Sequence, residues 1–522
     1  MRRRPLLLAG AAAWAVTPAG LRAQTQPAGP QAPALDDRPG PGFSRLVIAR
    51  WGDMLQPDAP PFQPNALTID QANTQFAYDM SIAALITPPP AQDGIARLVM
   101  VLANPTAPAR MLFPDGADNP AVAGREQGVT IADLEYLSGR WVTAVGGYQT
   151  RRLADDAFCQ FSGPAAGPLG GTALGLVAVQ GGGVAPWGNI LLAEGDATPW
   201  LSRLAGLGLG YEDPTHAARY GWVVELDALN PLFIPIKRTG LGRLARAGLL
   251  ATAARDGRPV VFFTQDDPAG LLFRFVAAAN TGDGTALDTG TLAVATLNTD
   301  GIDWVDLPND LASLVGLAGA AANAGGERFD APGGLALSQD GMTLYLACGG
   351  NPARGVADAL NPRAGNDDGH IVQFTLPGGD ASARHFPASL ALVAGDPASA
   401  PGTRYGPGSQ AWLRKPRSLA VDPAGNLWIG TDQRGQTTRT ADGYFIMQAA
   451  GPARGAVACA YLAPVGAAAG GAAFDANTKT AFGSIRHPGA TPEASFVQPA
   501  TRWPTLDPAM PPQSTIIGLV IQ

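Results

Sequence analysis

Short apolar runs broken by turn residues repeat along the chain from residue 46 onward, and long helical patterns are few. Three segments share the same pattern: residues 335–346, 419–429 and 472–482. Each begins with an apolar run, continues with an Asp that has Gly or Asn nearby, and ends with a second apolar run. Each predicts two antiparallel strands joined by a tight turn. Residues 260–276 form a looser fourth copy of the pattern.

Repeated hairpins separated by long insertions are typical of a β-propeller, here an all-β fold of about six blades. A pair of β-sandwiches is the alternative that fits the same strands. Short helices are predicted at residues 69–76, at 243–254 and around 311–322, as insertions and connectors between the blades.

The first residues have the layout of an export signal. Three arginines at positions 2–4 precede a weakly apolar, alanine-rich run that ends in small residues before Gln24. Paired arginines before such a run favour the twin-arginine variant over an ordinary secretory signal. The sequence thus divides into a signal (1–23), a flexible lead-in rich in Pro, Gly and Ala (24–44) and a folded propeller (45–522) that is periplasmic or secreted.

Charge and cysteine content narrow the class of protein. The chain has 36 basic and 43 acidic residues, and the signal contains four of the arginines and none of the acids, so the remainder carries a net charge of −11. An acidic chain without a basic stripe does not indicate a nucleic-acid partner. No apolar run reaches the roughly 20 residues that span a membrane. The three cysteines, Cys159, Cys348 and Cys459, fit neither a disulfide framework nor a zinc motif.

Seven segments, in order along nearly the whole chain, resemble the PhoX-type alkaline phosphatase family. They are residues 51–53, 162–167, 181–188, 221–227, 237–243, 266–267 and 487–489. The resemblance implies an exported propeller that hydrolyses phosphate esters at a central cluster of calcium and iron ions. Such a cluster uses carboxylate oxygens for Ca²⁺ and carboxylates with a thiolate for iron.

The chain departs from the family pattern at five positions where the resemblance implies metal ligands. The family's cysteine is replaced by Gln180, and its Glu-bearing motifs are altered at Asn104, Ala247 and Gly333. Arg417 stands where the family has an Asp. A fixed cation in a metal shell repels divalent ions strongly at such short range. Iron is therefore not expected, and calcium is the metal expected if one is bound.

Four acids remain in family-like segments: Glu194, Glu225, Asp266 and Asp267. They are candidate ligands for one calcium ion, or alternatively carboxylates that close turns and blades. A family-like pair of cations, Arg151 and Arg152, is a candidate anion site or a surface charge that brackets a blade. His487 also lies in a family-like segment.

Three hypotheses of function follow. The first is an exported phosphatase-like propeller with a degenerate or calcium-only centre, for which a small phosphoester is the expected ligand. The second is a propeller that has kept the fold without the cluster and serves as a binding module. The third is a calcium-dependent, lactonase-like hydrolase built on the retained acids. No Ser–His–Asp motif or His-rich metal motif is present.

Overall fold

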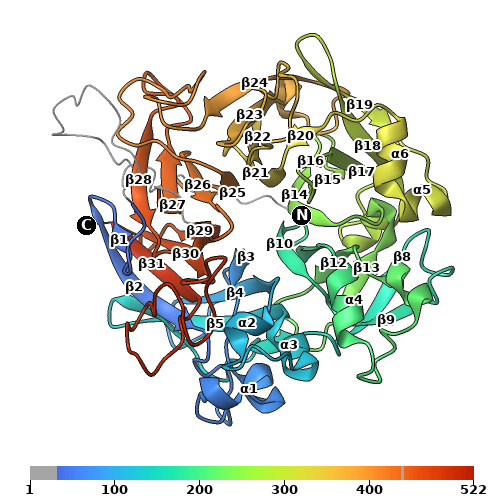
Figure 1. The fold of residues 1–522 in the computed structure, drawn as a ribbon. Coiled ribbons are helices and arrows are strands. Elements are labelled where there is room, and N and C mark those ends of the chain that lie inside the picture. The colour runs from blue at the N-terminus through green and yellow to red at the C-terminus, as the bar shows by residue number, and fades with distance from the viewer. Residues whose placement is uncertain (1–31, 437–439, 522) are drawn as a thin grey trace.

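Antiparallel strands arranged radially about one axis make up most of the computed structural model, which describes residues 32–436 and 440–521. In the view along this axis the chain runs once around the ring (Figure 1). Six blades result, as the sequence predicts. The predicted signal lies outside the described residues, and so does the lead-in as far as residue 31.

The first three blades follow each other in the chain. The first contains β3 (Ser81–Ile86), β4 (Arg97–Asn104), β5 (Gly128–Leu137), β6 (Arg140–Thr143) and β7 (Arg151–Leu153). The second contains β10 (Val179–Val184), β11 (Ile190–Glu194), β12 (Val223–Leu226) and β13 (Ile236–Arg238), with β8 (Phe158–Ser162) and β9 (Thr172–Leu174) at its edge. The third contains β14 (Arg246–Ala253), β15 (Pro259–Gln265), β17 (Leu272–Ala277), β18 (Gly290–Leu297) and β19 (Gly301–Asp306).

The last three blades complete the circle. The fourth contains β21 (Pro332–Leu337), β22 (Thr343–Cys348), β23 (His370–Thr375) and β24 (His385–Val393), and β24 pairs with β19 of the third. The fifth contains β25 (Pro416–Val421), β26 (Leu427–Thr431), β27 (Gly443–Met447), β28 (Val457–Leu462) and β1 (Arg38–Pro39). The sixth contains β29 (Ala468–Asp475), β30 (Thr480–Arg486), β31 (Thr515–Ile521) and β2 (Phe43–Arg50). A two-stranded sheet joins β16 (Ala269–Gly270) to β20 (Phe329–Asp330).

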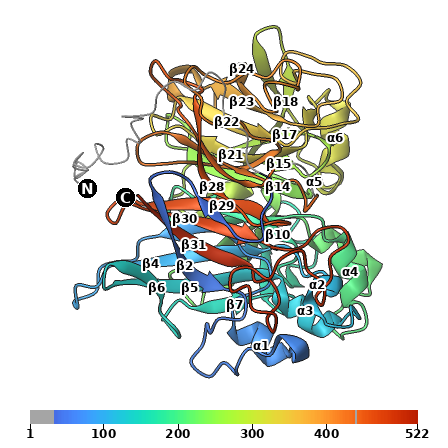
Figure 2. The ribbon, with the colours of Figure 1, turned by 60° about the vertical axis from the view of Figure 1, so that its left-hand side comes forward.

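Pairing of the two chain ends closes the ring. Strand β2 lies antiparallel to β31, from Phe43 opposite Ile521 to Arg50 opposite Thr515, and Figure 2 shows the two strands side by side. Part of the predicted lead-in also joins this end of the ring, because β1 pairs with β28 and β2 begins at Phe43.

Helices are short and lie in the connections. They are α1 (Ile69–Thr74), α2 (Ala109–Leu112), α3 (Pro120–Glu126), α4 (Thr198–Leu204), α5 (Leu311–Val315) and α6 (Leu317–Asn323), with 3₁₀ turns at Pro64–Ala66, Pro214–Arg219, Thr239–Leu241, Gly284–Asp288 and Pro377–Gly379. Among the described helices, none is long and apolar enough to cross a membrane.

Most of the predicted elements are confirmed. The hairpins at residues 335–346, 419–429 and 472–482 are the two inner strands of the fourth, fifth and sixth blades. The fourth copy is the β15–β17 pair of the third blade. The predicted helices are found as α1 and as α5–α6. The side chain of Thr68 caps the N-terminus of α1, and that of Asp310 caps the N-terminus of α5.

The helix predicted at residues 243–254 is wrong, because Arg246–Ala253 form strand β14. The segment is rich in Ala and Leu, which favour helix. Its backbone instead pairs along the length of β15, and pairing with a buried neighbour outweighs local propensity.

The cores lie between the blades. Six hydrophobic clusters fill the six interfaces between successive blades. Successive side chains of a strand point to opposite faces of its sheet. In β15, Val261 and Phe263 pack toward the second blade, and Val260 and Phe262 pack toward the fourth. Each blade is therefore buried on both faces.

Glycine allows the innermost strands to approach each other at the axis. A Cβ atom added to Gly471 of β29 would lie 1.9 Å from the carbonyl oxygen of Ile82 in β3. One added to Gly333 of β21 would lie 2.5 Å from the carbonyl oxygen of Arg417 in β25. Both contacts are with backbone, so relief would need movement of a whole strand.

We expect the substitution Gly471→Ala to destabilise the ring by about 1–3 kcal/mol, the usual cost of overpacking. The matched control is Gly181→Ala in β10, where an added Cβ meets nothing within 4 Å. Thermal unfolding should show a lower midpoint for Gly471→Ala only. Equal midpoints for the two variants would show that the β29–β3 contact does not limit the packing.

Candidate functional site

Each of the six innermost strands has a break in register near its start. The breaks fall at residues 82–84 in β3, 179–181 in β10, 246–248 in β14, 332–335 in β21, 416–418 in β25 and 469–472 in β29. Such β-bulges turn a residue out of the ladder and often flank functional sites. Successive innermost strands contact each other around the whole circle. The bulged residues therefore form a ring about the axis, which we call the bulge ring.

The bulge ring consists of Ala83, Gln180, Ala247, Gly333, Gly334, Arg417, Gly470 and Gly471. Four of the five positions at which the sequence departs from the family pattern are in it: Gln180, Ala247, Gly333 and Arg417. The fifth, Asn104, ends strand β4 next to β3. Sequence reasoning missed the members on β3 and β29, because a bulge is defined by the partner strand and leaves no local signal.

The side chains of the bulge ring do not fit a cluster of calcium and iron. None is a carboxylate, a thiol or an imidazole, and within the described residues no group of three or more His, Cys, Asp or Glu could hold a metal ion. Hard cations need several oxygen ligands. The Gly333 position also lacks room for a glutamate, because its Cβ would lie 2.5 Å from the Arg417 carbonyl oxygen.

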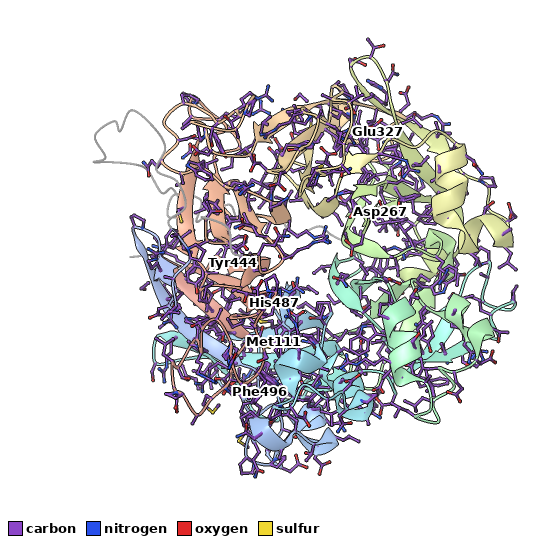
Figure 3. The ribbon with its side chains drawn as sticks, in the orientation of Figure 1. Met111, Asp267, Glu327, Tyr444, His487 and Phe496 are labelled. Atoms are coloured by element: carbon purple, nitrogen blue, oxygen red, sulfur yellow. The ribbon has the colours of Figure 1, made fainter. Side chains whose placement is uncertain are left out.

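Arg417 has an acidic partner at the axis. Its Nη2 donates to Oδ1 of Asp266 at 2.7 Å, and its Nη1 lies 3.4 Å from the Pro332 carbonyl oxygen. Asp267, the next residue, is exposed and accepts from the Ala269 backbone N–H at 2.8 Å. Figure 3 shows Asp267 and His487 on the axis side of their blades.

Glu194 lies in a buried ion pair. Its Oε1 accepts from Nζ of Lys237 at 2.7 Å, and both side chains are fully buried. Its Oε2 accepts the backbone N–H groups of Gly221 and Trp222 at 2.9 and 3.0 Å. The Lys237 ammonium also lies 4.5 Å from the centre of the Tyr220 ring. Both carboxylate oxygens are thus used inside the second blade.

Both carboxylate oxygens of Glu225 also accept hydrogen bonds within the protein. One oxygen accepts from Arg238, at 2.7 Å from Nε and 2.6 Å from Nη2. The other accepts from Trp187 Nε1 at 2.8 Å and Asn189 Nδ2 at 2.7 Å. Glu194, Glu225 and the adjacent pair Asp266–Asp267 therefore have different hydrogen-bond partners, and among the described residues they do not form a group that could hold a metal ion. Calcium binding by these four residues stays a prediction.

The candidate anion-binding arginines have protein partners. Arg151 donates to the carbonyl oxygens of Gln149 and Asp227 at 2.7 and 2.9 Å. Arg152 donates to Thr130 Oγ1 at 2.8 Å and to the Arg125 carbonyl oxygen, and burial lowers its pKa to about 10. These bonds join the first blade to neighbouring loops.

A second polar network lies beside the bulge ring. Buried Asp79 accepts from Nε and Nη2 of Arg486 at 2.8 Å each and from Thr106 at 2.6 Å. Burial alone would raise the pKa of Asp79, but Arg486 holds it below the ordinary value. Asn104, the altered family position, donates to the Asp79 carbonyl oxygen at 2.8 Å. Asn104 thus supports this ion pair.

Asp432 and Asp442, two neighbouring residues of the fifth blade, differ in the pKa of their carboxyl groups. Burial, followed by the charge of Asp432, raises the pKa of Asp442 to about 7. Burial also disfavours the charge on Asp432, but His487, Arg486 and Arg417 together hold its pKa below the ordinary value. Asp432 is therefore the more acidic of the two groups, and Asp442 takes up a proton at a higher pH than Asp432 does.

The environments of the three cysteines disfavour their nucleophilic thiolate form. All three are free, and Cys159 and Cys348 are buried. Burial raises the pKa of the Cys159 and Cys459 thiols to about 12, and the thiolate is the reactive form.

We expect Glu194→Gln to cost about 3–5 kcal/mol of stability, because it leaves the buried Lys237 charge without its partner. The double variant Glu194→Gln/Lys237→Met removes both charges and should recover much of the loss. The measurement is the thermal midpoint of each protein with and without calcium. A calcium-dependent rise in the wild-type midpoint that Glu194→Gln abolishes would contradict the structural role of Glu194.

The stability of the fold should depend on Asp442 at weakly acidic pH. The folded protein holds this proton more tightly than the unfolded chain, so stability falls as pH rises from the ordinary pKa of 3.8 to about 7. Asp442→Asn should flatten that part of the midpoint-against-pH curve, and Asp70→Asn, at an exposed residue of α1, should not. Parallel curves for wild type and Asp442→Asn would refute the assignment.

Comparisons with known proteins agree with this architecture. The sequence profile of the family described as alkaline phosphatase PhoX matches residues 32–489. The structure of Pseudomonas fluorescens PhoX in complex with vanadate, a transition-state analogue, superposes with a TM-score of 0.83 at 25% identity, over 95% of this chain and 98% of that one. A gluconolactonase from Xanthomonas campestris matches at a TM-score of 0.34 and 14% identity, over 96% of this chain and all of that one, which is too distant to carry an argument.

No curated protein matches the sequence significantly. The family profile, the superposition and the six-bladed ring agree over most of the chain. Four of the five positions at which the resemblance implies metal ligands lie in the bulge ring. The chain belongs to the alkaline phosphatase PhoX family.

Proposed function

We propose that this PhoX-family propeller is exported by the twin-arginine route to the periplasm and acts as a binding module whose centre has lost the family's metal cluster. The observation that carries the proposal is the bulge ring, whose side chains contain no carboxylate, thiol or imidazole. The family's reaction needs cations that hold the phosphoryl oxygens and activate the attacking oxygen. Phosphoester binding without such turnover is the activity that remains.

The charges beside the ring support the same proposal. Arg417 places a fixed positive charge where the family has a carboxylate, and its partner Asp266 is one of the four retained acids. A cation supplied by the chain thus neutralises an acid that could otherwise bind calcium. Nearby, Arg486 does the same for Asp79. The cation of each pair disfavours a divalent ion by charge, and at Asp79 both carboxylate oxygens also accept hydrogen bonds.

No observation favours the lactonase-like alternative. It depends on Glu225 as a metal ligand, and both oxygens of Glu225 accept hydrogen bonds from Trp187, Asn189 and Arg238. Chelator-sensitive lactone hydrolysis that disappears in Glu225→Ala would restore this alternative.

The test uses the exported, processed protein, with Pseudomonas fluorescens PhoX as the positive control. Calcium and iron are measured by elemental analysis, and hydrolysis of 4-nitrophenyl phosphate is measured with and without chelator. We expect neither stoichiometric iron nor chelator-sensitive turnover. Stoichiometric iron with turnover that the chelator abolishes would refute the proposal.

A further inference from the structure

A groove separate from the axis lies between the outer strands of the fourth and fifth blades. It has a volume of about 360 Å³, which is in the size range of small-molecule sites. Strands β23 and β24 form one wall, and the end of β27 with the loops at 404–406 and 454–455 forms the other. The bulge ring contributes no residue to it.

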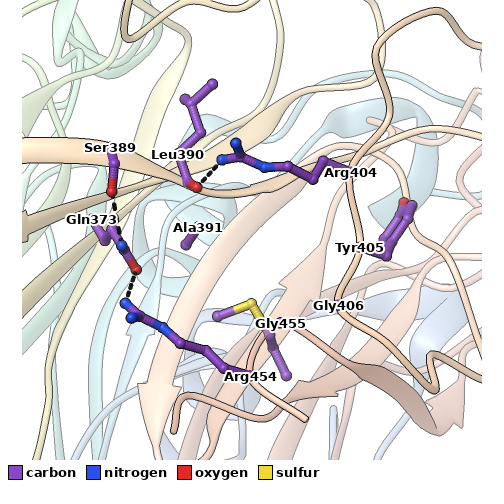
Figure 4. Close-up of a pocket in the computed structure, with 10 residues that line it drawn as sticks. Gln373, Ser389, Leu390, Ala391, Arg404, Tyr405, Gly406, Arg454 and Gly455 are labelled. Atoms are coloured by element: carbon purple, nitrogen blue, oxygen red, sulfur yellow. Dashed lines mark hydrogen bonds between the residues drawn. The ribbon is translucent and has the colours of Figure 1, made fainter. Parts of the chain in front are cut away.

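Two arginines face this groove from separate loops (Figure 4). Arg404 donates through Nη2 to the carbonyl oxygen of Leu390. Arg454 donates through Nη2 to Gln373 Oε1 at 2.8 Å, and Gln373 in turn donates to Ser389 at 2.8 Å. Because Gln373 lies opposite Ser389 in the β23–β24 ladder, both guanidinium groups are held against the same part of that ladder.

The positive charges of the groove are not neutralised by the protein. None of the residues that line it is acidic. Over the described part of the chain, neither Arg404 nor Arg454 takes part in an ion pair, and each uses a single nitrogen in its side-chain hydrogen bonds. A guanidinium has five N–H donors in a fixed fork that matches phosphate and carboxylate oxygens. Most of these donors therefore remain available to an anion.

The backbone that carries the two arginines is firmly placed. The backbone of Arg404 bridges to Val393 of β24. Two residues later, the Gly406 N–H donates to the Gly455 carbonyl oxygen at 2.7 Å. A Cβ on Gly406 would lie 2.2 Å from the Arg454 carbonyl oxygen. This close contact of two glycine-containing loops fixes the backbone from which both arginines extend, which reduces the cost of ordering the loops around a ligand.

We infer that this groove binds a small organic dianion of the phosphate-monoester type. The two guanidinium groups match two negative charges on one ligand. The apolar part of the ligand has matching surface on Leu390, Ala391 and Met447, which also line the groove. The inference goes beyond the proposed function at the axis, since it uses none of the same residues.

The test uses phenylphosphonate, a dianion with an apolar ring and no ester bond to hydrolyse, so that activity at the axis cannot consume the probe. Binding to the processed protein is measured by isothermal titration calorimetry at a pH that ionises both phosphonate oxygens. We expect one saturable site and an affinity that falls by about tenfold or more in Arg404→Ala and in Arg454→Ala, as for lost hydrogen bonds to a charged group. Benzoate, with one charge, should bind more weakly.

The matched control is Arg384→Ala, at an exposed arginine beside β24 that pairs with Asp306. A surface ion pair contributes little, so this variant should bind like wild type. Thermal midpoints verify that each variant is folded. Absence of saturable binding to the wild type would overturn the inference. Equal affinity in wild type, Arg404→Ala and Arg454→Ala would also overturn it, while leaving a ligand at the axis possible.

Discussion

Crowding of backbone around the axis is the constraint on which the rest of this structure depends. Six strands must meet there, and each contacts the next. The contacts leave no room for side chains at Gly333 and Gly471, whose Cβ atoms would strike neighbouring carbonyl oxygens. Each strand also breaks its pairing near its start. The bulged positions therefore lie where the innermost strands approach each other most closely.

Acids beside the axis and in the second blade are paired with cations that belong to the same chain. The family resemblance implies a cluster of metal ions held by carboxylates at the axis. Here the chain supplies its own cations: Arg417 for Asp266, Arg486 for Asp79, Lys237 for Glu194 and Arg238 for Glu225. Ion pairs of this kind satisfy buried acids without an external ion. The fold is therefore compatible with a centre that has lost the cluster, because the acids that remain contribute to packing and stability.

The sequence predicted the fold better than the site. Alternation of apolar runs with Asp–Gly turns identified three inner hairpins correctly, because strand period and turn chemistry are local properties. The helix predicted over β14 was wrong because the fold of this segment depends on a distant partner. Its Ala-rich composition favours helix, and its pairing with β15 makes it a strand. The family resemblance located four bulge-ring positions. It did not reveal that Glu194 and Glu225 are paired with Lys237 and Arg238, because these contacts join residues 43 and 13 positions apart.

An anomalous difference map from crystals grown with both calcium and iron would reveal directly whether the axis binds either metal. Anomalous scattering measured at the iron absorption edge gives the positions of iron, and scattering measured at a longer wavelength gives those of calcium. We expect no peak within the bulge ring and an intact ion pair between Arg417 and Asp266. A calcium or iron ion at the axis, coordinated by Asp266 or by residues near it, would contradict the loss of the metal cluster.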